Sequence, residues 1–470
     1  MLRTWFFNAI ISIFPISKQK NTMKKNPIYT LTIIFFLLAV GVIVYKFRMD
    51  KKQEESVQYR LKERTGPAAL TTEWTTTRKR AEYLEESIKK DPENIKARLT
   101  LAALFIQESR ITGDYLYYDR AAMRYVDNVL QKDSLNFEGL TLKALIHLSQ
   151  HHFADGLMVA EKAKAINPYN AFVYGILIDA NVEMGNYAKA VENSDKMVSI
   201  RPDLRSYSRI AYLREIHGDY PGAIEAMKLA VDAGSPGDEA TEWSRVQLGQ
   251  LYENVNDLPN AAMQYTISLQ ERPQYAYALA GLGRVARDKK EYSEALRYFR
   301  QADSSIHNYA FKEEMIEVYK LSGEPDQAKK LDGEVIDEMR AVAKKGETDP
   351  AAGHYADREL AIAYLNVKDY DNALKHALIE YNRRPLNIDV NETVAWVYYN
   401  RGEYQKALPF LQRAMKTHSR NPTLLCRAGL IYSQTGSKDS AKAIFKEVLP
   451  NHSNIPQDVD VASRKALQVL

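Results

Sequence analysis

The chain has 470 residues, of which 26% are charged, and its formal net charge is only +4. Binding to nucleic acid or another polyanion usually depends on a strong excess of positive charge, which this composition lacks. A single cysteine, Cys426, excludes an intrachain disulfide and any metal site built from several cysteines. The length suits several domains or one long array of repeated units.

An uncharged apolar run occupies residues 28–45 and reads IYTLTIIFFLLAVGVIVY. At about 1.5 Å per residue, a helix of this length approaches the roughly 30 Å hydrocarbon thickness of a bilayer. The run is longer than the apolar core of a typical signal peptide, and no site of the small-x-small type follows it. We therefore predict a transmembrane anchor at 28–45, preceded by a tail at 1–27. A cleaved signal peptide is the alternative.

Lysine and arginine residues flank the apolar run on both sides, so the rule that positive loops stay in the cytoplasm is nearly balanced. We expect a bacterial signal anchor that crosses the membrane once, with the following residues on the extracytoplasmic (periplasmic) side. The opposite orientation stays open. Residues 46–77 mix charges with a Gly-Pro pair and several threonines, a composition that predicts a partly helical linker without a core of its own.

A small residue recurs at a regular interval along the remainder of the chain. Successive intervals are 34, 33, 38, 34, 33, 45, 34 and 34 residues. The two long intervals contain extra residues at 232–240 and 344–353, after which the phase resumes. Stacked modules tolerate such insertions, whereas a single fused core does not. The recurring residues are Gly156, Ala190, Ala223, Ala261, Ala295, Ala328, Ala373, Ala407 and Ala441.

Each unit contains two apolar helical stretches joined by a short turn. In one unit, Leu248, Gly249 and Tyr252 have spacings that place them on one face of the first helix. Ala261 and Tyr265 share a face of the second helix in the same way, and a proline then ends it. Small residues on both helices allow a close approach, and the aromatic residues fill the space between units.

These motifs resemble the tetratricopeptide repeat (TPR), a helix–turn–helix module of 34 residues. Ala295 with Phe299 and Ala441 with Phe445 match the second helix of its pattern. The resemblance implies an all-α, right-handed superhelical solenoid of about ten repeats over 78–455. A last helical stretch at 456–470 is expected to cap the open end.

Candidate catalytic or metal-binding residues are few. His151-His152 is the only histidine pair, and we interpret it as two solvated turn residues because no carboxylate or cysteine has ligand spacing. The charged cluster at 354–359 is typical of local interactions at a helix start. No histidine has the spacing of a base for Cys426, and no phosphate-binding loop or hydrolase motif is present. We therefore predict no enzyme activity, no cofactor and no metal.

The TPR resemblance implies a concave groove, lined by the first helices, that binds an extended peptide or a partner helix. Two sets of residues are expected to face this groove. The first set is basic and aromatic and suits an acidic peptide, whereas the second set is acidic. For any single aromatic residue, the alternative to ligand binding is packing within the fold. The first set is Arg205, Arg209, Tyr212, Trp243, Gln247, Tyr277 and Arg284, and the second is Glu313, Glu314, Glu317, Asp389, Glu392 and Trp396.

These features favour a membrane-anchored scaffold that binds protein or peptide partners in its groove and supports the assembly of a complex. The partner is not identified by the sequence, because the inference to protein binding rests on the fold. Nucleic acid and a small-molecule substrate are not expected. The alternatives are a regulatory subunit or an enzyme with an activity hidden in a polar cluster, and a purely structural spacer.

Overall fold

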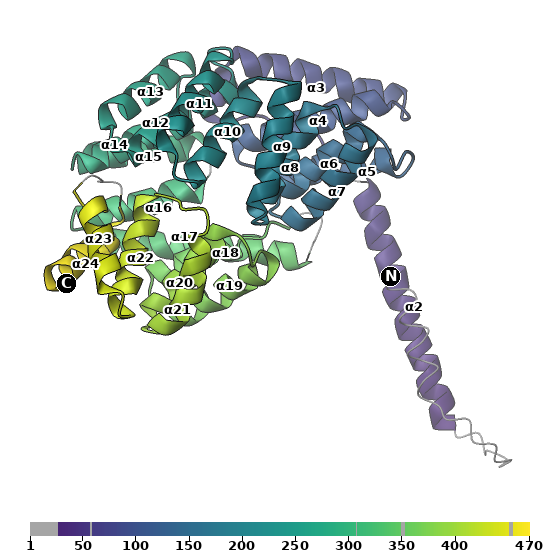
Figure 1. Cartoon of the computed structure of the whole chain (residues 1–470). Helices are drawn as coiled ribbons and strands as arrows, with labels where there is room; N and C mark the ends of the chain where they lie inside the picture. Colours follow the sequence, from purple (N-terminus) through teal and green to yellow (C-terminus); the bar gives the residue numbers. More distant parts are fainter. Residues whose placement is uncertain (1–26, 57–58, 307, 349–352, 451–454) are drawn as a thin grey trace. The chain divides into compact units, whose positions relative to one another are not determined.

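A computed structural model describes residues 27–56, 59–306, 308–348, 353–450 and 455–470 (Figure 1). The chain divides into two units, Met1–Tyr59 and Arg60–Leu470. The predicted tail at 1–27 lies outside the described residues, except for Pro27. The described residues form α-helices and one short 3-10 helix, η1 (Gly66–Leu70), and contain no strand, so the all-α prediction is confirmed.

The described part of the first unit is one helix, α2 (Pro27–Ser56). Among the described residues, no helix combines the length and the apolar character needed to cross a membrane. The transmembrane helix expected at 28–45 is therefore not supported.

Ten helix pairs follow one another in the described part of the second unit, and this number agrees with the predicted ten repeats. Helix α3 (Thr72–Lys90) precedes the pairs, and α24 (Gln457–Val469) follows them and packs on α22 and α23. The pairs are α4 (Ile95–Thr112) with α5 (Tyr115–Leu130), α6 (Phe137–Ser149) with α7 (Phe153–Ile166), α8 (Ala171–Glu183) with α9 (Tyr187–Ile200), α10 (Leu204–Ile216) with α11 (Tyr220–Asp232), α12 (Glu239–Asn254) with α13 (Leu258–Glu271), α14 (Ala276–Asp288) with α15 (Tyr292–Ser305), α16 (Tyr309–Leu321) with α17 (Pro325–Thr348), α18 (Asp357–Asn366) with α19 (Tyr370–Arg383), α20 (Ile388–Asn400) with α21 (Tyr404–Ala414), and α22 (Pro422–Gln434) with α23 (Lys438–Val448).

The recurring small residues lie where the helices cross, as predicted. All nine of them are buried. A Cβ added to Gly249 would come within 2.4 Å of the Tyr265 ring, and one added to Gly429 would come within 2.5 Å of the Phe445 ring. The glycine on the first helix thus leaves the space that the aromatic side chain of the second helix occupies.

Residues 60–77, expected to be a linker without a core, take part in the packing of the second unit. Arg64 is only 5% exposed and donates to both carboxylate oxygens of Glu108 on α4, at 2.6 and 2.9 Å. Trp74, in the first turn of α3, is also buried. These residues cover the apolar face that the first helix pair would otherwise expose.

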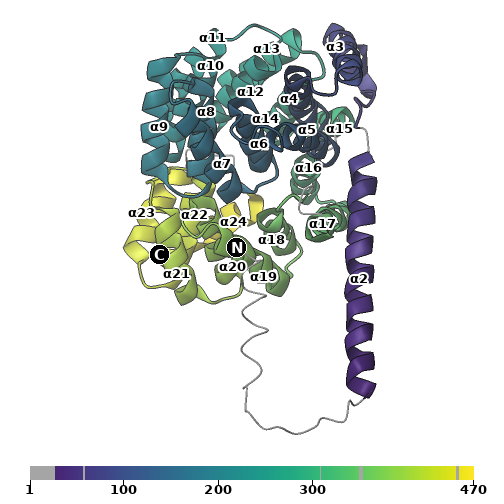
Figure 2. The same ribbon diagram turned by 90° about the vertical axis from the view of Figure 1, so that its right-hand side faces the viewer.

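Segments about 200 residues apart are in contact, because the solenoid returns onto itself after six pairs. The turn after α8 meets the turn before α20: Asn387 donates to the carbonyl of Glu183 at 3.0 Å, and the backbone amide of Ile388 donates to the Tyr187 hydroxyl at 2.9 Å. Gly185, at φ +77°, has no room for a Cβ because the backbone of Leu386 would lie 2.3 Å from it. Figures 1 and 2 show α7–α9 beside the C-terminal pairs.

One arginine connects the two stretches of the solenoid that meet here, the pairs near α8 and the pairs near α20, which form its two levels. Arg384, which directly follows α19, is 6% exposed and pairs with Glu183 of α8 and with Glu380 of α19. Its guanidinium also lies over the Phe153 ring, 4.6 Å from the ring centroid. A buried cation with these partners makes the contact specific, since any other register would leave the charges unpaired.

We predict that Ala295→Leu, or Ala407→Leu, lowers the free energy of unfolding by about 1–3 kcal/mol, because the added atoms have no space at a helix crossing. Ala165→Leu is the control, since Ala165 is exposed on α7. Thermal melting followed by circular dichroism measures the effect. Unchanged melting of both buried variants would contradict the assigned repeat register.

We predict that Arg384→Ala costs about 3–5 kcal/mol, because it removes the ion-pair partner of Glu183 and one of the two arginine partners of the buried Glu380, which keeps only Arg383. Arg401→Ala is the matched control: Arg401 pairs with Glu403 and with the exposed Asp371, and such pairs contribute about 0–1 kcal/mol. Denaturant unfolding of both variants gives the comparison. Equal losses would show that the contact between levels adds no stability.

Candidate functional site

Two of the three aromatic residues of the first predicted set, Trp243 and Tyr277, form a row of ring contacts with Phe311 on successive first helices. The Trp243 ring of α12 meets the Tyr277 ring of α14 edge to face, with centroids 5.0 Å apart. Tyr277 in turn contacts Phe311 of α16, with centroids 6.0 Å apart. Trp243 and Tyr277 are half-buried, so they stabilise the stack of repeats and still present part of each ring.

Two of the three predicted arginines are engaged within the chain. Arg209 makes a bidentate pair with Asp179, at 2.6 and 2.9 Å, and also donates to the carbonyl of Gly175. Arg284 pairs with Glu253 at 2.9 Å and donates to the Tyr265 hydroxyl at 3.2 Å. These guanidinium groups already have the carboxylate partners that the sequence interpretation assigned to a bound peptide.

The other members of the first set differ in their accessibility. Arg205 is exposed and lies over the Phe172 ring, 5.0 Å from its centroid. Tyr212 is 38% exposed, and Gln247 is half-buried. The structure thus brings Trp243 and Tyr277 together, while Arg205 is the most open cation of the set.

A cavity of about 1180 Å³ lies further along the inner surface, in the region of the second predicted set. None of the seven residues of the first set lines it. The first helices of the last five pairs (α14, α16, α18, α20 and α22) form most of its wall, together with α24. Its lining includes Arg287, Glu313, Glu314, Glu317, Lys320, Trp396, Arg427, Val461 and Arg464.

Most charged groups around this cavity have partners in the chain. Arg287 pairs with Glu314 at 2.7 Å, and Arg427 pairs with Glu392 at 2.8 Å. Glu317 accepts the backbone amide of Gln457 at 2.7 Å, which ties the start of α24 to α16. The cavity therefore has fixed walls with charges of both signs.

Glu313 stands out among the lining carboxyl groups because its pKa is strongly shifted. Burial and the neighbouring charges of Glu359 and Glu314 together raise the pKa of Glu313 to about 8, against a lowering by Arg358. Below about pH 7 this side chain is therefore mostly a neutral acid, with a proton that it can donate in a hydrogen bond.

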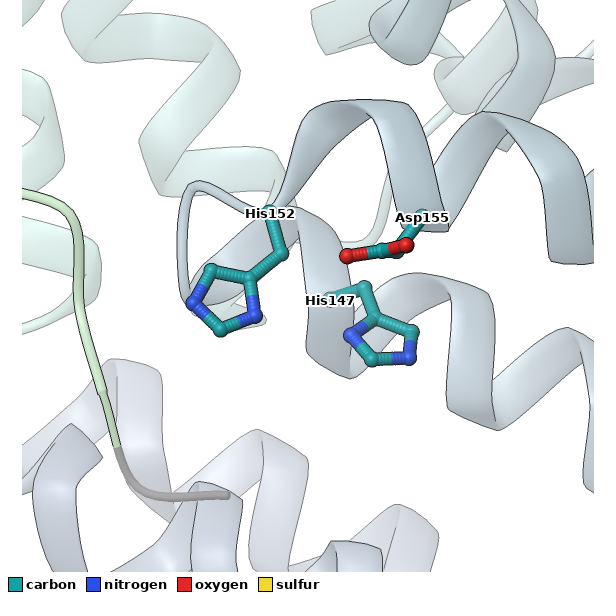
Figure 3. Close-up of side chains that lie close together, drawn as sticks. All are labelled: His147, His152 and Asp155. Atoms are coloured by element: carbon teal, nitrogen blue, oxygen red, sulfur yellow. The ribbon is translucent and has the colours of Figure 1, made fainter. Parts of the chain in front are cut away.

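A histidine cluster at the turn between α6 and α7 differs from the sequence interpretation. The prediction that His151 and His152 are solvated turn residues is wrong. His152 is only 7% exposed, and His151, with φ +60°, contacts the carbonyl of Tyr355 through Nδ1 at 3.0 Å. His152 also lies near His147 and Asp155, and the ligand atoms of these three residues lie within 4.8 Å of one another (Figure 3).

The sequence reasoning missed this group because it searched for partners of the adjacent pair. His147 precedes His152 by five residues across the turn, and Asp155 follows by three. The sequence pattern that could have predicted this group is a histidine at the end of one helix followed by a carboxylate in the first turn of the next. Burial lowers the pKa of His147 to about 4 and also lowers that of His152, so both rings are neutral at neutral pH.

The lone cysteine is inert. Cys426 is fully buried on α22, and burial raises the pKa of its thiol to about 11. A thiol that stays protonated at neutral pH is a poor nucleophile.

The architecture defines an all-α repeat protein, and comparison with family models specifies the repeat. Three segments match models described as tetratricopeptide repeat, over residues 246–309, 393–420 and 422–449. These segments fall on the helix pairs α12–α15 and α20–α23. These three segments are therefore similar to tetratricopeptide repeats, in agreement with the sequence resemblance.

Several solved structures have similar helical arrays. The Pseudomonas aeruginosa protein pilF is 14% identical, with 47% of this chain and 94% of that chain covered and a TM-score of 0.36. PilW, a type IV pilus biogenesis factor, is 16% identical (42% and 90% covered, TM-score 0.36). The Cut9–Hcn1 hetero-tetramer of the APC/C is 16% identical (80% and 63% covered, TM-score 0.37). No curated protein sequence matches the chain. Likenesses at these low scores carry no argument about function.

We predict that Glu313→Gln stabilises the protein at pH 8.5 much more than at pH 5. The folded protein holds the Glu313 proton up to about pH 8, whereas an ordinary glutamate has a pKa of 4.5, so rising pH favours the unfolded chain. One pKa unit corresponds to about 1.4 kcal/mol, and the partly open site reduces the gain to about 1–3 kcal/mol.

The measurement is the melting temperature of the wild type and the variant at both pH values. Glu334→Gln is the control, since Glu334 is exposed on α17. A variant whose pH profile parallels that of the wild type would show that Glu313 ionises normally.

Proposed function

We propose that the chain is a scaffold that holds a segment of a protein partner on the inner surface of its TPR solenoid. The observation that carries this proposal is the cavity of about 1180 Å³ on that surface. Pockets for small molecules usually measure about 300–1,000 Å³, so this volume suits a peptide segment with several side chains. The first helices that line it are the elements on which TPR proteins generally present their binding residues.

The chemistry of the wall supports a peptide rather than a simple ion. Trp396 is only 7% exposed, stacked on Tyr399 with centroids 4.8 Å apart and covered by Arg427, so it shapes the wall without presenting an open ring. Glu313, as a neutral acid, offers a donor, and Val461 adds an exposed apolar group on α24. Apolar anchors beside fixed polar groups are typical of sites that bind side chains and backbone together.

The basic and aromatic set identified in the sequence supports a second contact on the same inner surface. Arg205 and the exposed parts of Tyr212, Trp243 and Tyr277 are available to a bound chain. Arg209 and Arg284 contribute less directly, because their carboxylate partners lie within the solenoid. The partner would then run along the inner surface from one region to the other.

We predict that Val461→Asp reduces partner binding at least tenfold without changing the melting temperature. Val461 is 58% exposed and lines the cavity, so a carboxylate there disturbs an apolar contact and not the core. Val469→Asp is the matched control: it lies on the same helix, is 80% exposed and does not line the cavity. Affinity purification from source cells with quantitative mass spectrometry gives the readout.

Two further variants complete the experiment. Trp243→Ala tests the basic and aromatic region, and Glu192→Arg, exposed on the second helix α9, tests the outer surface. The proposal expects losses from the inner variants alone. It fails if the set of co-purified proteins changes only with Glu192→Arg, or if no variant changes it.

A further inference from the structure

The turn between α6 and α7 brings together three side chains of the kind that bind transition metals. His147 comes from the last turn of α6, His152 stands directly before α7, and Asp155 lies in the first turn of α7. In Figure 3, one nitrogen of each imidazole ring faces the other ring, and a carboxylate oxygen of Asp155 lies beside them. The two rings lie nearly parallel, at 28°, with centroids 6.0 Å apart.

The hydrogen bonding of this group is incomplete. His147 Nδ1 is buried and has no hydrogen-bond partner among the described residues. A buried polar atom without a partner costs about 1–3 kcal/mol, so such atoms usually have a function or an absent ligand. Lys143 is the cation of α6 that acts on His147, and it pairs with Asp127 at 2.7 Å.

We propose that His147, His152 and Asp155 form a binding site for a zinc ion or a similar divalent transition metal. Two imidazole nitrogens and one carboxylate oxygen are ligands that suit zinc, whereas calcium and magnesium prefer oxygen ligands alone. Zinc bonds of about 2.0–2.2 Å place tetrahedral ligands about 3.4 Å apart. The ligand atoms lie within 4.8 Å of one another, so small side-chain rotations close the site.

The residues around this site allow an ion to enter from solvent and connect the site to a neighbouring segment of the chain. Asp155 is exposed, so an ion can enter from solvent, and three protein ligands leave one tetrahedral position open. The buried His152 ring lies 4.2 Å from the Tyr355 ring, in the segment that enters α18. A bound ion would cross-link the end of α6 to the start of α7 and stiffen the contact between α6–α7 and residues 353–355.

The test uses the full chain without a polyhistidine tag, freed of metal by a chelator. Calorimetric titration with zinc should show one ion per chain, and cobalt should give the absorption bands of a four-coordinate site. Zinc should also raise the melting temperature, because an ion that binds only the folded state stabilises it.

His147→Gln and Asp155→Asn should each weaken zinc binding at least tenfold and abolish the cobalt bands. Asp155 is exposed, so its variant keeps the fold even if a change at a buried histidine does not. His418→Gln is the matched control, because His418 is exposed and belongs to another repeat. The proposal is overturned if the wild type binds no zinc at 100 µM, or if Asp155→Asn and His418→Gln bind zinc as the wild type does.

Discussion

The close approach of two helices within each repeat is the constraint on which the rest of the structure depends. At Gly249 and Gly429 the first helix carries no side chain, and the rings of Tyr265 and Phe445 occupy the space. A larger residue would separate the two helices and strain the contacts with the adjoining pairs, because each repeat contacts mainly its neighbours. Small residues recur at a regular interval in the sequence because each repeat has this requirement. Insertions at 232–240 and 344–353 lie between repeats, so the small residues resume their regular spacing after them.

Contacts between the two levels constrain the solenoid in addition to the contacts between neighbouring repeats, and a simple linear array has no such contacts. Arg384 and Asn387 connect the turn before α20 to α8, and Gly185 allows the backbones to meet. These contacts link repeats that are six pairs apart. Coupling of distant repeats opposes the independent opening of single units, which is otherwise expected of solenoids. The cavity walls are consequently held from two directions, by neighbouring repeats and by the adjoining level.

The inner surface carries many charged side chains, but few of them are available to a ligand. Arg209 and Arg284 illustrate this, because both have carboxylate partners within hydrogen-bonding distance. Partial burial strengthens such pairs and makes each one costly to disrupt. Groups left over from this pairing, such as Glu313 with its raised pKa and the His147 imidazole with its unpartnered nitrogen, are therefore the most informative about ligands. They point to a polar cavity and to a separate metal site.

The sequence by itself determined the fold class, the number of repeats and the residues at the helix crossings, since these follow from local periodicity and side-chain size. It placed the groove at the basic and aromatic set, whereas the cavity is lined by Glu313, Glu314, Glu317 and Trp396 of the second set and not by Asp389 or Glu392. Only the tertiary structure decided the partners of Arg209 and Arg284, the burial of Arg64 and His152, and the contacts between levels. These depend on residues 30 to 200 positions apart, as Asp179 is from Arg209 and Glu183 is from Arg384. The superhelical path that brings them together arises from small rotations summed over many repeats, which no single motif encodes.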